Sequence, residues 1–248
     1  MATLTGKVLL MTLSHPVQAT ARVLSLVVLL GPSGAPGALS APIRVVTWNV
    51  ANNPDDAGED AAFATVLGAI GHIDLLAVAE TDTGSSMRPV EVLNATHGID
   101  AYEVVTSSSY GGDRTALLYD TGTPDLLDVV DLATLGPHPV VRGQFHVDDT
   151  GDFYIYAVHL KSGSASSDKA MRATEAANLR EDADTLGEGT HIIYAGDFNL
   201  HGSTEAAWAA MVAPGPGQGS DVAEAPGVWR DNTNVPSPAH PGPDSQHG

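Results

Sequence analysis

The stretch His191-Ile192-Ile193-Tyr194-Ala195-Gly196-Asp197-Phe198-Asn199 begins as an apolar run and ends with a carboxylate and an amide. A short run of β-branched and aromatic residues closed by glycine predicts a buried strand over 191–195. Reactive side chains in α/β folds collect where buried strands end. Asp197 and Asn199 are therefore candidate site residues.

Three other predicted strands lead to similar side chains. The run 43–49 ends at Asn49, the run 74–79 leads into Glu80, and the run 153–159 ends at His159. Carboxylates and amides in a chain without cysteine suit a hard ion such as Mg²⁺, Mn²⁺ or Ca²⁺. An imidazole can contact a phosphate or move a proton. Taken singly, each residue also fits a purely structural role.

The remaining periodic segments alternate between helix and strand. Phe63, Val66, Leu67 and Ile70 share one face of a predicted helix over 59–70, and Gly71 is its predicted C-cap. The other predicted elements are a short helix at 89–97, strands at 102–106, 115–119 and 140–147, a charged helix at 167–186 capped by Ser166 or Ser167, and a helix at 203–212. This alternation favours an α/β or mixed sandwich.

Four motifs then follow one another along the chain. They are Val45-Val46-Thr47-Trp48-Asn49, Asp74-Leu75-Leu76-Ala77-Val78-Ala79-Glu80, Tyr156-Ala157-Val158-His159-Leu160-Lys161-Ser162 and Gly196-Asp197-Phe198-Asn199. Over about residues 43–212 this set resembles the endonuclease/exonuclease/phosphatase superfamily, which includes relatives of DNase I, abasic-site endonucleases, sphingomyelinases and inositol-phosphate phosphatases. The segment 113–119 and the pair Arg172 and Glu175 resemble minor elements of the same family.

The resemblance implies a four-layer α/β sandwich, with two mixed β-sheets packed face to face and helices outside. It also implies hydrolysis of phosphodiesters or phosphomonoesters with a divalent metal. Carried over by position, Glu80 resembles the main metal carboxylate and Asn49 the residue that binds the metal or orients that carboxylate. His159 resembles the phosphate-contacting histidine, Asp197 the residue that activates water, and Asn199 the amide that holds a phosphate oxygen.

Three further residues are candidates for contact with substrate phosphate. Arg114 and Lys161 are rare positive charges near the motifs, and Tyr110 precedes a Gly-Gly pair. Their alternative roles are surface pairing for the two cations and loop ordering for the tyrosine.

The sequence also departs from the family pattern. Ala79 stands where the family often has glutamine, and Ala157 where it often has asparagine. The family closes with a strand carrying an adjacent Asp-His pair, and no such pair follows Asn199; Asp244 and His247 are not adjacent. We expect a C-terminally incomplete sequence, with a natural truncation and lost activity as the alternative.

The N-terminal segment has the pattern of an export signal. Residues 1–41 contain no acid, and the apolar run 23–30 follows Arg22 directly. Small residues at Ala38 and Ser40 fit cleavage after Ser40. The run is short for a stable membrane span. We predict a signal peptide and a secreted or extracytoplasmic protein; a buried strand or a weak anchor is the alternative.

Composition limits the classes of function. The 248 residues have 30 acidic and 11 basic side chains, a formal charge of −19, and no cysteine. The charge disfavours nonspecific clamping of duplex DNA unless metal ions offset it. The absence of cysteine excludes disulfides, thiolate zinc sites and a cysteine nucleophile.

The sequence is therefore interpreted as a signal peptide at 1–41, an endonuclease/exonuclease/phosphatase domain at 42–212, and a Pro/Gly-rich end of that domain or an irregular tail at 213–248. The predicted function is hydrolysis of a phosphoester substrate, most simply a nucleic acid, with Mg²⁺, Mn²⁺ or Ca²⁺. The alternatives are a sphingomyelinase-like enzyme, a sugar-phosphate phosphatase, or a noncatalytic binding module.

Overall fold

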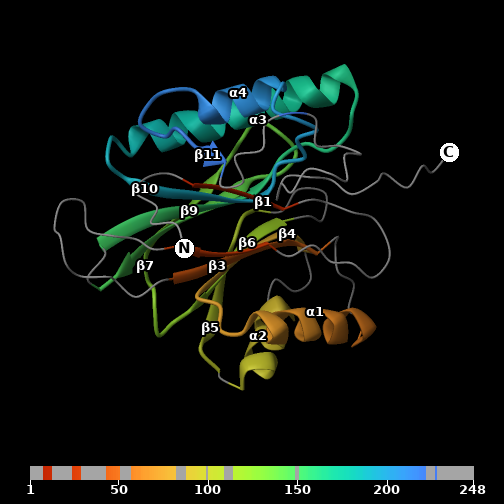
Figure 1. Ribbon diagram of the computed structural model, residues 1–248, viewed down its shortest axis with the longest axis vertical. Helices are drawn as coiled ribbons and strands as arrows, with labels where there is room; N and C mark the ends of the chain where they lie inside the picture. Colours follow the sequence, from red (N-terminus) through yellow and green to blue (C-terminus); the bar gives the residue numbers. More distant parts are fainter. Residues whose placement is uncertain are drawn as a thin grey trace.

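Four layers of secondary structure make up the computed structural model (Figure 1). It describes residues 8–12, 24–28, 43–50, 57–81, 88–98, 100–108, 114–148, 151–221 and 227. Two β-sheets lie face to face, and helices cover the outer side of each (Figure 1). The predicted four-layer α/β sandwich is confirmed. Within the described ranges no helix is long and apolar enough to cross a membrane.

The first sheet has six strands and contains both parallel and antiparallel pairs. Its order is β11 (Ser220–Asp221), β1 (Val8–Thr12), β10 (His191–Asp197), β9 (Gly151–His159), β8 (Val140–Val147) and β7 (Asp125–Leu132). The second sheet has five strands and is also mixed. Its order is β2 (Leu24–Val28), β3 (Ile43–Asn49), β4 (Leu75–Thr81), β6 (Arg114–Asp120) and β5 (Tyr102–Thr106).

Three buried apolar clusters fill the spaces between the four layers. One joins the first sheet to α3 (Ser166–Thr185) and α4 (Ala206–Val212). A second lies between the sheets, and a third joins the second sheet to α1 (Ala57–Ile70) and α2 (Arg88–His97). Strand β9 serves two of these clusters, because successive side chains of a strand point to opposite faces. Ile155 packs between the sheets, whereas Tyr156 packs toward the helices.

One local prediction is wrong, and one strand was not predicted. The N-cap of α3 is Ala165, not Ser166 or Ser167, and the Asp168 carboxylate accepts the Ala165 N–H at 3.1 Å. Strand β7 was not predicted at all. It is an edge strand whose residues are mostly exposed, with Leu127 52% and Val129 37% accessible, so no regular burial pattern marks it in the sequence.

Two segments from residues 1–41 lie in strands. Strand β1 pairs in parallel with β10, and β2 pairs antiparallel with β3. Val8–Thr12 and Leu24–Val28 are therefore strand segments of the two sheets, as in the strand alternative for the N-terminal segment. Each strand covers a backbone edge that would otherwise be open. Removal of a signal peptide stays a prediction. Asp244, His247 and most of the predicted tail lie outside the described residues.

Candidate active site

The site lies where four strands end. Strands β3 and β4 are parallel, and Asn49 pairs with Ala79, directly before Glu80. Strands β9 and β10 are also parallel, and His159 pairs with Asp197. Because the two sheets pack face to face, these ends meet. Ligand atoms of Glu80, His159 and Asp197 all lie within 4.8 Å of one another.

Asn49 connects the two sheets at this point. Its amide Nδ2 donates to Glu80 Oε1 at 2.8 Å and to Asp197 Oδ2 at 2.9 Å. His159 Nε2 lies 3.4 Å from the same Glu80 oxygen. His159 and Asp197 are buried, whereas the Glu80 side chain keeps 19% of its surface accessible. The predicted residues Asn49, Glu80, His159 and Asp197 therefore form one cluster, in which Asn49 donates to both carboxylates.

An irregularity in β4 aims Glu80 into the cluster. The register of β4 against β6 shifts between Ala79 and Thr81, and Glu80 has a φ of 59°. Such a bulge bends a strand and turns a side chain away from its regular direction. The carboxylate of Glu80 can thus face Asn49 and His159 while the strand continues at Thr81.

The turn after β10 fixes Asp197. Gly196 sits so close to β9 that a Cβ atom would overlap the Val158 carbonyl oxygen. Asp197 Oδ1 accepts the backbone N–H of Asn199 at 2.9 Å, and Asn199 has a φ of 50°. Asparagine tolerates this left-handed conformation better than most residues. The Gly-Asp-Phe-Asn motif is therefore a close-packed turn that presents the second carboxylate.

The other predicted residues are placed in different ways. The amide Nδ2 of Asn199 donates to the Leu160 carbonyl at 2.9 Å, and its phosphate contact stays a prediction. Lys161 Nζ lies 3.5 Å from Asp168 Oδ1 and keeps 35% of its side-chain surface accessible. Arg114 pairs in register with Thr81, beside Glu80. Tyr110 lies outside the described residues.

Sequence reasoning missed two residues near the site. His138 stacks on His159 with ring centroids 4.1 Å apart and planes 19° apart. Glu205 forms a buried ion pair with Arg172. The family resemblance included Arg172 but did not identify its partner. His138 belongs to the irregular segment between β7 and β8, and no local pattern places it beside β9.

The donor set fits a divalent cation. Two carboxylates that share one amide donor repel each other, and Asp197 has no exposed surface. Glu80 is the residue that would hold the ion, and Asp197 and His159 have ligand atoms within 4.8 Å of its carboxylate. Carboxylate oxygens are the ligands that Mg²⁺, Mn²⁺ and Ca²⁺ prefer.

A comparison with protein families agrees with this geometry. The model of the endonuclease/exonuclease/phosphatase family matches residues 46–241, which include Glu80, His159 and Asp197. The chain belongs to the endonuclease/exonuclease/phosphatase family. Members of this family are in general metal-dependent phosphoesterases, which agrees with the carboxylate and imidazole donors of the site. A search of curated proteins found no match.

Solved structures confirm the fold of this family member. The human Nocturnin catalytic domain with bound sulfate is 16% identical with a TM-score of 0.57, covering 78% of this chain and 73% of its own. A humanized D. rerio TDP2 is 18% identical with a TM-score of 0.53, covering 70% and 68%. D. rerio TDP2 complexed with a single-strand DNA product is 17% identical with a TM-score of 0.51, covering 65% and 62%.

A buried carboxyl group behind the site makes stability depend on pH. Burial raises the pKa of Glu175 from 4.5 to about 7, although the Lys161 N–H and the charges of His159, Arg172 and Lys161 act to lower it. The unfolded chain releases this proton near pH 4.5 and the folded chain only near pH 7. Folding stability therefore falls by about 3 kcal/mol as the pH rises across that interval.

We expect Glu175→Gln to remove this loss of folding stability at high pH. Glutamine is neutral, and its oxygen can still accept the Lys161 N–H that Glu175 Oε2 accepts at 2.7 Å. Thermal unfolding should show a larger gain in Tm over wild type at pH 8 than at pH 5. Glu181→Gln, at an exposed position of α3, is the control and should show no such difference. Equal gains at both pH values would contradict the assignment.

Proposed function

We propose that the protein is an exported, divalent-metal-dependent phosphoesterase that hydrolyses phosphodiesters and acts as a nuclease. The observation that carries the proposal is the convergence of Glu80, His159 and Asp197 within 4.8 Å at the ends of three strands. These side chains combine negative charge for a cation, an imidazole for a phosphate oxygen and a buried base for water.

Each residue has a task in the proposed reaction. Asp197 holds the attacking water and accepts its proton while the water oxygen bonds to phosphorus. The ester P–O bond breaks, and the leaving oxygen keeps the bonding electron pair and takes a proton from solvent. His159 and Asn199 hold oxygens of the phosphate as negative charge develops. A bound divalent ion supplies positive charge to the phosphate. Glu80 holds that ion, and Asn49 keeps Glu80 directed at it.

Two cations lie close along the chain or in register to residues of this cluster, and they are proposed to bind further phosphates of the substrate. Lys161 follows β9 two residues after His159, and Arg114 opens β6 opposite Thr81. In a chain with 11 basic residues against 30 acidic ones, positive charge near the site is scarce. Contacts from these two side chains to neighbouring phosphates would favour a nucleic acid over a phosphomonoester.

The nuclease proposal is preferred over a sphingomyelinase-like one for two reasons. The D. rerio TDP2 neighbour is complexed with a single-strand DNA product. Membrane-acting members of the family typically reach lipid with an exposed aromatic loop. Among the described residues, the exposed large apolar side chains are Leu127, Val129, Leu135 and Met171, and none of them is aromatic.

A substrate panel tests the function. The purified full chain, with Mg²⁺ or Mn²⁺, is assayed on single-stranded DNA, plasmid DNA, sphingomyelin and an inositol phosphate, each with and without a chelator. Metal-dependent cleavage of DNA supports the proposal. Faster turnover of sphingomyelin or the inositol phosphate would replace it with the corresponding alternative. Calorimetric Mg²⁺ binding without turnover of any substrate would instead favour a noncatalytic binding module.

Export has its own test. In a host that secretes proteins, we expect material outside the cells to begin at Ala41, because Ser40 and Ala38 fit the small-residue cleavage pattern. Ala38→Asp should block processing, whereas Ala35→Asp, upstream of the cleavage pattern, should not. N-terminal sequencing reads both outcomes. Cell-retained protein that keeps residues 1–41 would favour their role as strands β1 and β2.

A further inference from the structure

We propose that Arg172 and Glu205 are a positioning pair that locks the loop after β9 against the loop after β10. The pair would fix Lys161 relative to Asp197 for catalysis. This inference rests on the proposed phosphoesterase function. Neither residue belongs to the cluster of Glu80, His159 and Asp197, so the pair acts on the reaction through the two loops.

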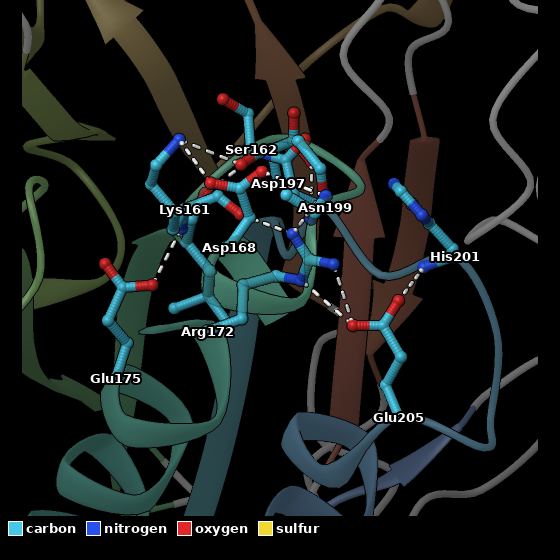
Figure 2. Close-up of polar contacts among 12 residues, drawn as sticks. Lys161, Ser162, Asp168, Arg172, Glu175, Asp197, Asn199, His201 and Glu205 are labelled. Carbon is cyan, nitrogen blue, oxygen red and sulfur yellow. Dashed lines mark hydrogen bonds and ion pairs between the residues drawn. The ribbon is translucent and has the colours of Figure 1, made fainter. Parts of the chain in front are cut away.

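Arg172 reaches the loop after β9 from helix α3. Its guanidinium is fully buried, and its NH1 donates to the Lys161 carbonyl at 2.7 Å and the Gly163 carbonyl at 2.9 Å. Figure 2 shows the Arg172 side chain pointing into the region between Lys161 and Glu205. One rigid, planar group thus holds two carbonyls of a three-residue segment, which fixes the direction of that segment.

Glu205 extends the same connection to the loop after β10. Its Oε2 accepts from Arg172 Nε at 3.1 Å and from NH2 at 2.8 Å, while its Oε1 accepts the His201 backbone N–H at 2.8 Å (Figure 2). Glu205 is also the N-cap residue of α4, but its side chain makes no capping hydrogen bond. Its carboxylate is directed to Arg172 and the loop instead.

Further contacts join the two loops next to the site. Asn199 Nδ2 donates to the Leu160 carbonyl at 2.9 Å, and the Leu160 N–H donates to the Asp197 carbonyl at 2.9 Å. Glu175 Oε2 accepts the Lys161 N–H at 2.7 Å. The backbone of Leu160 and Lys161 is therefore held from α3 on one side and from the Asp197 turn on the other. A shift of either loop would move Lys161 relative to Asp197.

A requirement for stability alone does not account for this pair. Burying two charges costs free energy, and apolar residues of similar size often replace a buried ion pair without loss of stability. A second buried arginine of α3 gives the contrast. Arg180 pairs with Asp184 and donates to the carbonyls of Ala210, Met211 and Ala213, where α4 ends, and it touches neither site loop.

The test compares Arg172→Lys with Arg180→Lys. We expect Arg172→Lys to lower kcat on single-stranded DNA by about tenfold or more with a smaller change in KM, because supporting residues are commonly worth that much. Arg180→Lys should change kcat by less than about twofold. The double variant Arg172→Met/Glu205→Met should fold but stay as slow as Arg172→Lys, because it removes both charges together.

A second readout does not depend on activity. Hydrogen exchange should speed up in segments 160–163 and 199–205 of the Arg172 variants, and not in those segments of Arg180→Lys. If the wild type hydrolyses no substrate, the proposed function fails, and faster exchange in these loops still supports the loop lock. Wild-type kcat in the double variant, or exchange unchanged in both segments, would overturn the positioning role.

Discussion

Replacing Glu80 with glutamine is expected to lower kcat/KM for DNA cleavage by about a thousandfold, or about 4 kcal/mol of transition-state stabilisation. Glutamine has nearly the same volume, and its oxygen can still accept from Asn49 Nδ2, which now donates to Glu80 Oε1 at 2.8 Å. The variant loses the negative charge that would hold a divalent ion. Steady-state rates at saturating Mg²⁺ measure the effect.

The same variant should not lose stability in the absence of metal. Glu80 and Asp197 both accept from Asn49, so their two negative charges lie close together. Removing one charge relieves that repulsion, and the Tm of metal-free Glu80→Gln should equal or exceed that of wild type. Asp128→Asn, an exposed carboxylate on edge strand β7, is the charge-matched control and should keep full activity. A Glu80→Gln enzyme with near wild-type turnover would remove Glu80 from the site.

Replacing Gly196 with alanine is expected to have the largest effect on stability. A Cβ atom at Gly196 would lie 2.7 Å from both the carbonyl carbon and the nitrogen of Val158, in addition to its overlap with the carbonyl oxygen. These are backbone atoms of β9, so no side-chain rotation relieves the contact. We expect a loss of at least about 3 kcal/mol, the upper part of the range for overpacking. For a chain of this length, that corresponds to a fall in Tm of about 10 °C.

Activity should fall along with stability in this variant. Gly196 pairs with Val158 and Asp197 pairs with His159, so separating the strands at Gly196 moves both site residues. Gly187→Ala is the control for backbone conformation alone, because Gly187 has a φ of 88° and no atom within 4 Å of an added Cβ. That variant should lose only about 1 kcal/mol. Similar losses for both variants in thermal or urea unfolding would show that close packing at Gly196 is not the cause.

Strong local patterns predicted most of the fold. Predicted strands at 43–49, 102–106 and 140–147 coincide with β3, β5 and β8. The predicted face of α1 is confirmed, because Phe63 and Leu67 are buried in the cluster against the second sheet. These segments are apolar runs or amphipathic faces whose burial follows directly from residue spacing. Strand β7 and the Ala165 N-cap were not predicted. The exposed edge strand has no regular burial pattern, and Ala165 makes no side-chain cap hydrogen bond.

The sequence by itself determined the residue types of the site and their place at strand ends. Asn49, Glu80, His159 and Asp197 each follow or close an apolar run, and that pattern is local. Only the tertiary structure decided how these residues meet. The amide of Asn49 connects carboxylates 31 and 148 residues away, on two different sheets. Likewise, His138 stacks on His159, and Glu205 joins Arg172 across 33 residues. Such contacts depend on sheet packing and strand register, which residue spacing along one segment does not specify.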